Sequence, residues 1–235
     1  MISAFLLAFG QLSDKSLRRV VWIGLFGSLA ILFVVWFSIG FTLFKSDFFA
    51  TGWLFGVFDW LIEKLTAMFG GVFIIIVTWF IFPSVATLII SFFLEDAVLA
   101  VERKYYPGLP ATRVQSLKVI VQITLKFTAL SIGLNILTLP IYAMFFFLGP
   151  LNLFVFYILN GYLLGREYFE LIAHRRLGPL EVTHLRQTCK VKIFLAGMII
   201  TFLMTVPIIN LVTPVVATAA MVHLVQRWHN TNVSS

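Results

Sequence analysis

The sequence predicts an all-α integral membrane protein with two long transmembrane helices, two re-entrant helical hairpins and a helical cytoplasmic extension. Hydrophobic residues make up 60% of the 235 residues and charged residues make up 11%, whereas a soluble domain usually has about 25% charged residues. The mean hydropathy is +1.01. The apolar residues form long blocks, and the last two blocks are interrupted by proline or glycine. We therefore expect a single membrane domain over residues 1–235.

The N-terminal part is expected to hold an interfacial helix followed by two spanning helices. Residues 1–19 combine a short apolar helix, suited to the membrane interface, with the basic turn at residues 13–19. Residues 20–44 and 65–94 are two apolar runs, and each exceeds the roughly 20 residues that a bilayer crossing needs. The second run is expected to continue as a helix into water as far as Tyr106.

Two later apolar stretches are predicted to be helical hairpins. Residues 127–165 carry no charged side chain over about 39 residues, which is too long for one crossing and slightly short for two crossings and a turn. Pro140 and Gly149-Pro150 interrupt this stretch near its middle. Residues 193–226 are interrupted by prolines into arms of only about 13 residues each. The second hairpin is therefore expected to enter the bilayer and return without crossing it.

The distribution of basic residues predicts the topology of these segments. The net charge is +7, and basic residues concentrate before the first helix and in the second and third connections. The positive-inside rule places those segments, and with them both termini, in the cytoplasm. Both hairpins must then leave from and return to the same side. The basic residues, in chain order by segment, are Lys15, Arg18 and Arg19; then Lys45 and Lys64; then Arg103, Lys104, Arg113, Lys118 and Lys126; and then Arg166, Arg175, Arg176, Arg186, Lys190 and Lys192.

The basic turn before the first spanning helix is a candidate oxyanion site. Ser16, Leu17, Arg18 and Arg19 lie where the interfacial helix gives way to the spanning helix. Free backbone N–H groups at a helix start, together with two guanidinium groups, can bind a tetrahedral oxyanion. The alternative is that the two arginines anchor the helix to lipid phosphates and set its orientation.

Polar residues along the two predicted hairpins are candidates for an anion pathway. Basic stripes lead into each hairpin and could concentrate anions, although they could instead extend to lipid headgroups. Neutral amides at membrane depth could donate to an anion, or could cap the hairpin tips. No acidic residue lies within the apolar runs, which favours passive conduction or coupling by another means. The pathway candidates are Lys118, Gln122, Lys126, Asn135, Asn152, Arg186, Lys190 and Asn210.

Nothing in the sequence indicates an enzyme, a cofactor, a metal centre or a nucleic-acid partner. No nucleophile elbow, phosphate-binding loop or zinc-protease motif occurs. Glu167, Glu170 and His174 share a helical face, but arginines surround them, so a solvated and salt-bridged surface is the favoured interpretation. Cys189 is the only cysteine, which excludes an internal disulfide.

Four segments carry the pattern of a known family, namely Ser16-Leu17-Arg18-Arg19, Phe92 to Pro107, Gly165-Arg166-Glu167-Tyr168-Phe169 and Val206 to Ala217. In these segments the chain resembles the CysZ sulfate permeases of bacteria and the related etoposide-induced 2.4 proteins. That resemblance implies a bacterial inner-membrane protein with two long transmembrane helices, two hemi-penetrating hairpins, a helical cytoplasmic head and homo-oligomers built from dimers. It also implies sulfate uptake for cysteine synthesis, with sulfate bound near a Gly-Leu-Arg motif that corresponds here to Ser16-Leu17-Arg18.

The leading hypothesis is therefore an anion permease for sulfate, with sulfate or a similar oxyanion and membrane lipids as its partners. The alternative, from another class, is a non-transporting membrane scaffold or a protein that binds anionic lipid through its basic segments.

Overall fold

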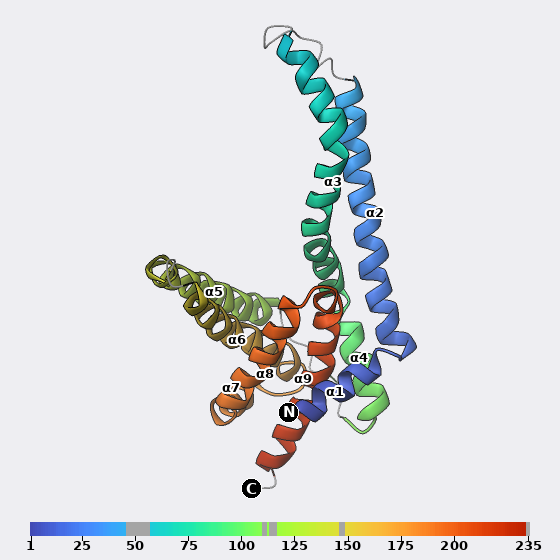
Figure 1. The fold of residues 1–235 in the computed structure, drawn as a ribbon. Helices are drawn as coiled ribbons and strands as arrows, with labels where there is room; N and C mark the ends of the chain where they lie inside the picture. Colours follow the sequence, from blue (N-terminus) through green and yellow to red (C-terminus); the bar gives the residue numbers. More distant parts are fainter. Residues whose placement is uncertain (46–56, 110–111, 113–116, 146–148, 234–235) are drawn as a thin grey trace. The chain divides into compact units, whose positions relative to one another are not determined.

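The computed structural model describes residues 1–45, 57–109, 112, 117–145 and 149–233, and it describes side chains over residues 1–42, 72–109, 112, 121–145 and 149–231. Over this part of the chain every regular element is a helix (Figure 1), so the predicted all-α class is confirmed. The helices are α1 (Ile2–Gln11), α2 (Lys15–Lys45), α3 (Val57–Phe92), α4 (Leu94–Tyr105), α5 (Leu117–Met144), α6 (Pro150–Ala173), α7 (Pro179–Thr188), α8 (Lys190–Thr205) and α9 (Ile209–Val233).

The chain divides into two compact units. One unit contains Met1–Arg18 and Leu94–Ser235, and the other contains Arg19–Phe93. We call them the head unit and the helix-pair unit. The single membrane domain expected over residues 1–235 stays a prediction.

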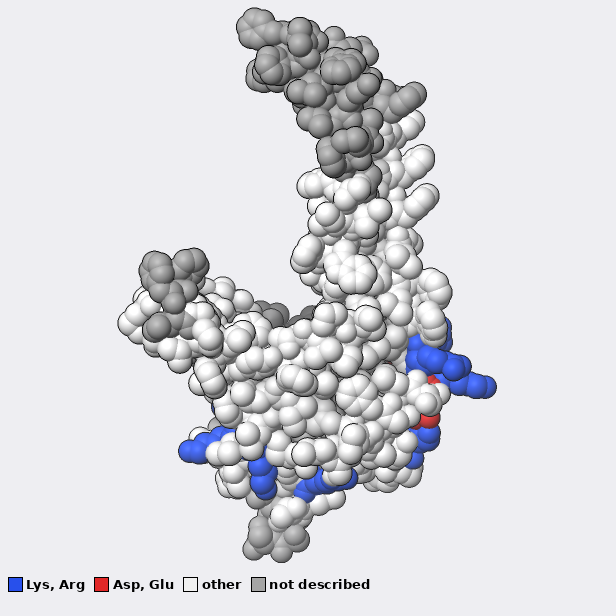
Figure 2. All heavy atoms as spheres, viewed as in Figure 1, with Lys and Arg blue, Asp and Glu red and all other residues white. Residues whose placement is uncertain are grey.

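The helix-pair unit consists of α2 and α3 running antiparallel. Gly24 lies against Ile90, and the Trp36 indole N–H donates to the Thr78 hydroxyl at 2.8 Å. Most of the described apolar side chains of this unit face outward; Phe33, for example, is 70% exposed. After Arg19, none of the side chains described for this unit carries a charge, and the described part of the pair is white in Figure 2. An apolar exterior of this kind suits contact with lipid.

Several helices are long and apolar enough to cross a membrane. Among the described residues four pass by length and composition, namely Lys15–Thr42, Val72–Phe92, Val121–Met144 and Ile209–Thr231. A fifth span is possible if Pro179–Thr188 and Lys190–Thr205, which meet at a bend of 81°, are counted together. The protein is therefore a multi-pass membrane protein. How far each hairpin enters the bilayer stays a prediction.

The predicted continuous helix from the second apolar run to Tyr106 is wrong. α3 ends at Phe92, and α4 begins at Leu94 after a turn in which the Phe93 N–H donates to the Ile90 carbonyl at 2.9 Å. α4 buries Leu94, Ala97, Val98 and Val101, a stripe at helical spacing, and it packs against α9. The chain turns because this apolar stripe is buried within the head unit.

The helices break near both predicted hairpin tips, whereas α5 continues through Pro140 without the break predicted there. That the two helix pairs are re-entrant hairpins stays a prediction. The α5–α6 connection ends at Gly149, which has φ 21°, and the α8–α9 connection contains Ile208 with φ 68°. Positive φ suits glycine but is strained for a β-branched residue. α9 runs on to Val233 and is therefore longer than the predicted arm of about 13 residues, because the helix continues past Pro214 and through polar residues at its end.

α9 is the core of the head unit. Every residue from Thr213 to Gln226 is buried, and α1, α4, α6 and α8 pack around it. A helix that is buried on all sides is expected to be apolar or small-residue-rich around its whole circumference. The run Val215-Val216-Ala217 and the residues Ala219, Ala220 and Met221 satisfy this requirement.

Glycines allow α6 and α8 to pack at very short distance. Gly161 and Gly165 lie four residues apart on α6 and face Gly197 of α8. A Cβ atom at Gly197 would overlap the carbonyl oxygen of Gly161 and lie 2.5 Å from the Gly165 amide nitrogen. Small residues at this spacing let helix backbones approach each other.

We expect Gly197→Ala to lower the free energy of unfolding by about 1–3 kcal/mol, because both colliding atoms belong to the backbone and cannot move aside. Unfolding in detergent micelles, followed by circular dichroism, measures this. Gly133→Ala on α5 is the matched control, since nothing lies within 4 Å of its added Cβ. Equal effects of the two changes would contradict the close crossing.

Candidate functional site

The predicted oxyanion turn lies at the start of α2. This helix begins at Lys15, so Ser16, Leu17, Arg18 and Arg19 occupy its first turns. The Asp14 carbonyl accepts the Arg18 N–H at 2.9 Å. The N–H groups of residues 15–17 therefore precede the first hydrogen bond of the helix and point out from its N-terminus.

Burial separates the predicted site residues into one inward and three outward side chains. Leu17 is 1% exposed, whereas Ser16, Arg18 and Arg19 are exposed. The buried leucine fixes the rotation of the helix start, because turning it outward would expose an apolar side chain. One hydroxyl and two guanidinium groups are thereby left accessible beside the helix N-terminus.

An ion pair lies immediately before this turn. The Lys104 ammonium group, from the last turn of α4, lies 2.5 Å from an Asp14 carboxylate oxygen. The hydrogen bond to Asp14 raises the pKa of Lys104 above its ordinary value. A carboxylate at this place would repel an anion, and the ammonium group of Lys104 offsets that negative charge.

The pathway candidates on α5 are not gathered into a cavity. Gln122 and Lys126 are exposed, and the Asn135 amide donates to the Ser131 carbonyl of its own helix at 2.8 Å. Lys118 lies on α5, but its side chain is outside the described residues. This helix therefore presents its candidate polar groups to its surroundings and not to a described cavity.

The candidates on the third connection have different surroundings. Arg186 of α7 donates to Glu170 at 2.6 Å, whereas Lys190 is exposed at the first position of α8. Arg186 is thus held by a carboxylate of the protein, so only Lys190 presents its charge openly.

The two asparagine candidates lie near the hairpin tips. Asn152 is in the first turn of α6 and Asn210 is in the first turn of α9. Each has a buried side-chain oxygen with no hydrogen-bond partner in the described part of the chain. Between α6 and α8, near the same end, the Tyr157 hydroxyl and the Thr205 hydroxyl lie 3.0 Å apart. The tips therefore hold unpaired amide groups, which are costly unless they are satisfied by water or a ligand.

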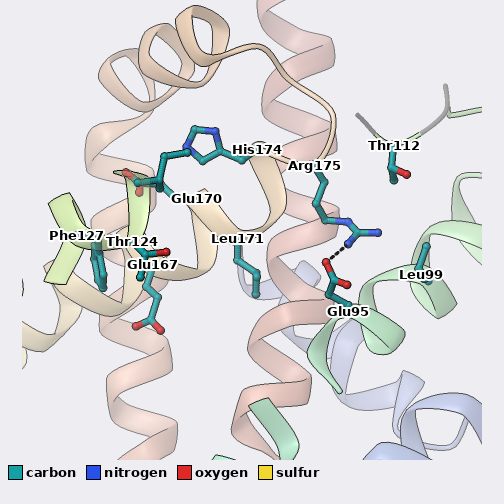
Figure 3. A pocket seen from close by; sticks show the side chains of 11 residues that line it. Glu95, Leu99, Thr112, Thr124, Phe127, Glu167, Glu170, Leu171, His174 and Arg175 are labelled. Atoms are coloured by element: carbon teal, nitrogen blue, oxygen red, sulfur yellow. Dashed lines mark hydrogen bonds and ion pairs between the residues drawn. The ribbon is translucent and has the colours of Figure 1, made fainter. Parts of the chain in front are cut away.

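A cavity in the head unit has a mainly acidic lining, whereas the sequence predicts basic stripes along an anion pathway. Its volume is about 640 Å³, and it lies among α4, α5 and α6 within the head unit (Figure 3). None of the pathway candidates whose side chains the structure describes lines it. Its lining residues are Glu95, Leu99, Thr112, Ile123, Thr124, Phe127, Glu167, Glu170, Leu171, His174 and Arg175.

The charged face of α6 is salt-bridged. One oxygen of Glu170 accepts from Arg166 at 2.7 Å and from Arg186 at 2.6 Å. Burial lowers the pKa of His174, although the charge of Glu170 opposes this. The described residues contain no group of three or more His, Cys, Asp or Glu side chains that could hold a metal ion.

Sequence reasoning missed a buried carboxylate on α4. The Glu102 side chain is 3% exposed and binds the Arg176 guanidinium in bidentate fashion, with distances of 2.9 and 2.8 Å. Arg175 lies 4.0 Å from the same carboxylate and 3.0 Å from Glu95 (Figure 3). These pairs join α4 to the turn between α6 and α7. The sequence could have indicated this burial, because Glu102 continues the stripe of Val98 and Val101 at helical spacing.

We expect Glu102→Gln to lower the free energy of unfolding by about 3 kcal/mol, because it removes the charge that the two guanidinium groups face in a buried setting. Glu95→Gln is the control. The Glu95 side chain is 75% exposed, so loss of its ion pair should lower the free energy of unfolding by less than about 1 kcal/mol. Denaturant unfolding in micelles compares the two, and equal costs would show that the Glu102 pair is not a stabilising contact.

The apolar spans and the exposed basic turn define a helical membrane protein with a polar site at the start of its first long helix. The sequence model of the family described as "Sulfate transporter CysZ/Etoposide-induced protein 2.4" matches residues 4–214. The chain therefore belongs to this family of transporter-type membrane proteins. A comparison with curated proteins finds no match.

Proposed function

We propose that this protein is a permease or channel of the bacterial inner membrane that takes up sulfate, or a similar oxyanion, for cysteine biosynthesis. The observation that carries the proposal is the start of α2, where Ser16 and Arg18 face outward around the buried Leu17. The resemblance described above implies that these residues correspond to a Gly-Leu-Arg motif near which the family binds sulfate.

The chemistry of this turn suits a tetrahedral dianion. Free N–H groups and the positive end of the helix dipole favour negative charge at the N-terminus of α2. Arg18 and Arg19 can each donate two parallel hydrogen bonds to oxyanion oxygens. Ser16 stands where the family motif has glycine, and its hydroxyl adds one donor to the site.

A pathway through the membrane would use neutral donors and few charges. Asn152 and Asn210 have buried, unpaired amide oxygens near the hairpin tips, and the apolar runs contain no acidic residue. An amide oxygen accepts hydrogen bonds, so only the N–H groups of these two side chains can donate to an anion. Lys126 and Lys190 are exposed basic groups at the ends of the predicted hairpins. If the tips stop within the bilayer, the two long helices or neighbouring subunits of a dimer-based oligomer complete the path.

A second candidate function is a membrane scaffold that binds anionic lipid. The same exposure of Arg18 and Arg19 favours it, since arginines flanking a membrane helix bind lipid phosphates. The acidic lining of the described cavity also offers no basic route for an anion at that place.

We expect Arg18→Ala combined with Arg19→Ala to reduce uptake of labelled sulfate into proteoliposomes about tenfold or more, because a hydrogen bond to a charged group contributes about 1.5–3 kcal/mol. The control is Arg103→Ala combined with Lys192→Ala, which removes two exposed basic residues outside the turn and should leave uptake unchanged.

Wild-type flux equal to that of empty vesicles would overturn the permease. The scaffold would then be favoured if the double arginine variant lost binding to vesicles of anionic lipid while the control variant kept it. Equal loss of sulfate uptake in both double variants would show that total charge, and not the turn at the start of α2, is responsible.

A further inference from the structure

A buried hydrogen-bonded chain within the head unit ends beside the candidate oxyanion turn. His223 is in the middle of α9 and is 1% exposed. Its Nε2 lies 2.7 Å from the side-chain nitrogen of Gln11, and its Nδ1 lies 2.8 Å from the hydroxyl of Tyr106. These contacts join three segments that are far apart in the sequence, and Figure 1 shows α1 crossing beside α9.

The imidazole of His223 is fully engaged by these two neighbours. A neutral imidazole has one donor and one acceptor nitrogen. With the Gln11 amide donating to Nε2, the proton is on Nδ1 and is donated to the Tyr106 oxygen. The ring of Tyr105 packs edge-on against the same imidazole, with centroids 5.4 Å apart. The His223 ring therefore fixes the positions of Gln11 and Tyr106 relative to α9.

Gln11 connects His223 to the candidate oxyanion turn. It is the last residue of α1 and is 2% exposed. Its side chain contacts His223, and its own carbonyl accepts the Asp14 N–H at 2.8 Å. The Asp14 carbonyl in turn accepts the Arg18 N–H at 2.9 Å. Two consecutive backbone hydrogen bonds thus connect the buried chain to the residue that carries the guanidinium group.

The end of α4 holds the same turn from its other side. Lys104 pairs with Asp14, and Tyr106, two residues later, bonds to His223. The lysine pair is largely exposed, with side-chain exposures of 54% and 27%, so it contributes little by itself. The buried bonds of His223 are the costly ones to lose, because each would leave a polar group unpaired away from water.

We infer that His223 and Gln11 are positioning residues, which orient Ser16 and Arg18 at the start of α2 for an oxyanion. This inference rests on the proposed function of that turn. The two residues do not touch the anion; they fix the three-residue connection between α1 and α2, so that Leu17 stays buried and its neighbours face outward.

The test measures sulfate uptake as a function of concentration in proteoliposomes. Gln11→Met keeps the length of the side chain and removes its hydrogen bond, and it should raise the KM for sulfate about fivefold, the loss that corresponds to one net hydrogen bond. Vmax should stay near the wild-type value, since the turn contributes binding and not the rate of passage. Tyr106→Phe and His223→Leu should change the KM in the same direction.

Thr218→Val is the matched control. Thr218 is on the same helix as His223 and is 0% exposed, and its hydroxyl has no hydrogen-bond partner among the described residues. Its removal should leave both constants unchanged. In an Arg18→Ala background Gln11→Met should have no further effect, because residues that act through one site are not additive.

The outcomes separate this inference from the proposed function. Absence of sulfate uptake by the wild type overturns the proposed function and the positioning role with it. Uptake that Arg18→Ala weakens, but that Gln11→Met and Tyr106→Phe leave unchanged in KM, overturns the positioning role alone. An equal KM increase with and without Arg18→Ala also overturns it. If His223→Leu fails to fold, Gln11→Met and Tyr106→Phe still decide, because each removes a single hydrogen bond.

Discussion

Burial of α9 on all sides is the constraint on which the head unit depends. Residues Thr213 to Gln226 have no free face, and α1, α4, α6 and α8 each pack against this one helix. Burial of apolar side chains favours the arrangement in proportion to the area removed from contact with solvent. The arrangement also forces any polar side chain of α9 to find a partner inside, and His223 does so through Gln11 and Tyr106.

Ion pairs between buried carboxylates and arginines also hold the helices of the head unit together. Glu102 and Glu170 are both nearly enclosed, and each is held by arginine side chains from another helix or turn. Such a pair is costly to bury, so its benefit lies in fixing one arrangement and not in raw stability. The arginines counted in sequence as topology signals, Arg175, Arg176 and Arg186, are thus also structural partners of carboxylates. The acidic cavity among α4, α5 and α6 follows from the same carboxylates.

Contacts with this core fix the geometry of the candidate oxyanion turn. α1 is joined to α9 through Gln11, and Asp14 is joined to α4 through Lys104, so the short connection before α2 is held at both ends. The two predicted hairpin tips differ in backbone strain, although both contain a residue with positive φ. Gly149 adopts a positive φ at little cost, whereas Ile208 adopts one against the preference of its branched side chain. Strain of that kind persists only where the surrounding structure enforces it.

The sequence by itself determined the helical membrane class, the two long apolar helices, and the breaks in the helices near Gly149 and Pro207. These features depend on local hydropathy, on proline and glycine, and on charge next to an apolar run. The turn predicted over residues 13–19 is shorter in the structure, because α2 already begins at Lys15. Only the tertiary structure decided that the chain turns at Phe93, that Glu102 is buried, that the cavity among α4, α5 and α6 is acidic and that Gln11 contacts His223. The physical reason is that each of these depends on which faces of distant segments pack together, and hydropathy along the chain carries no record of that pairing.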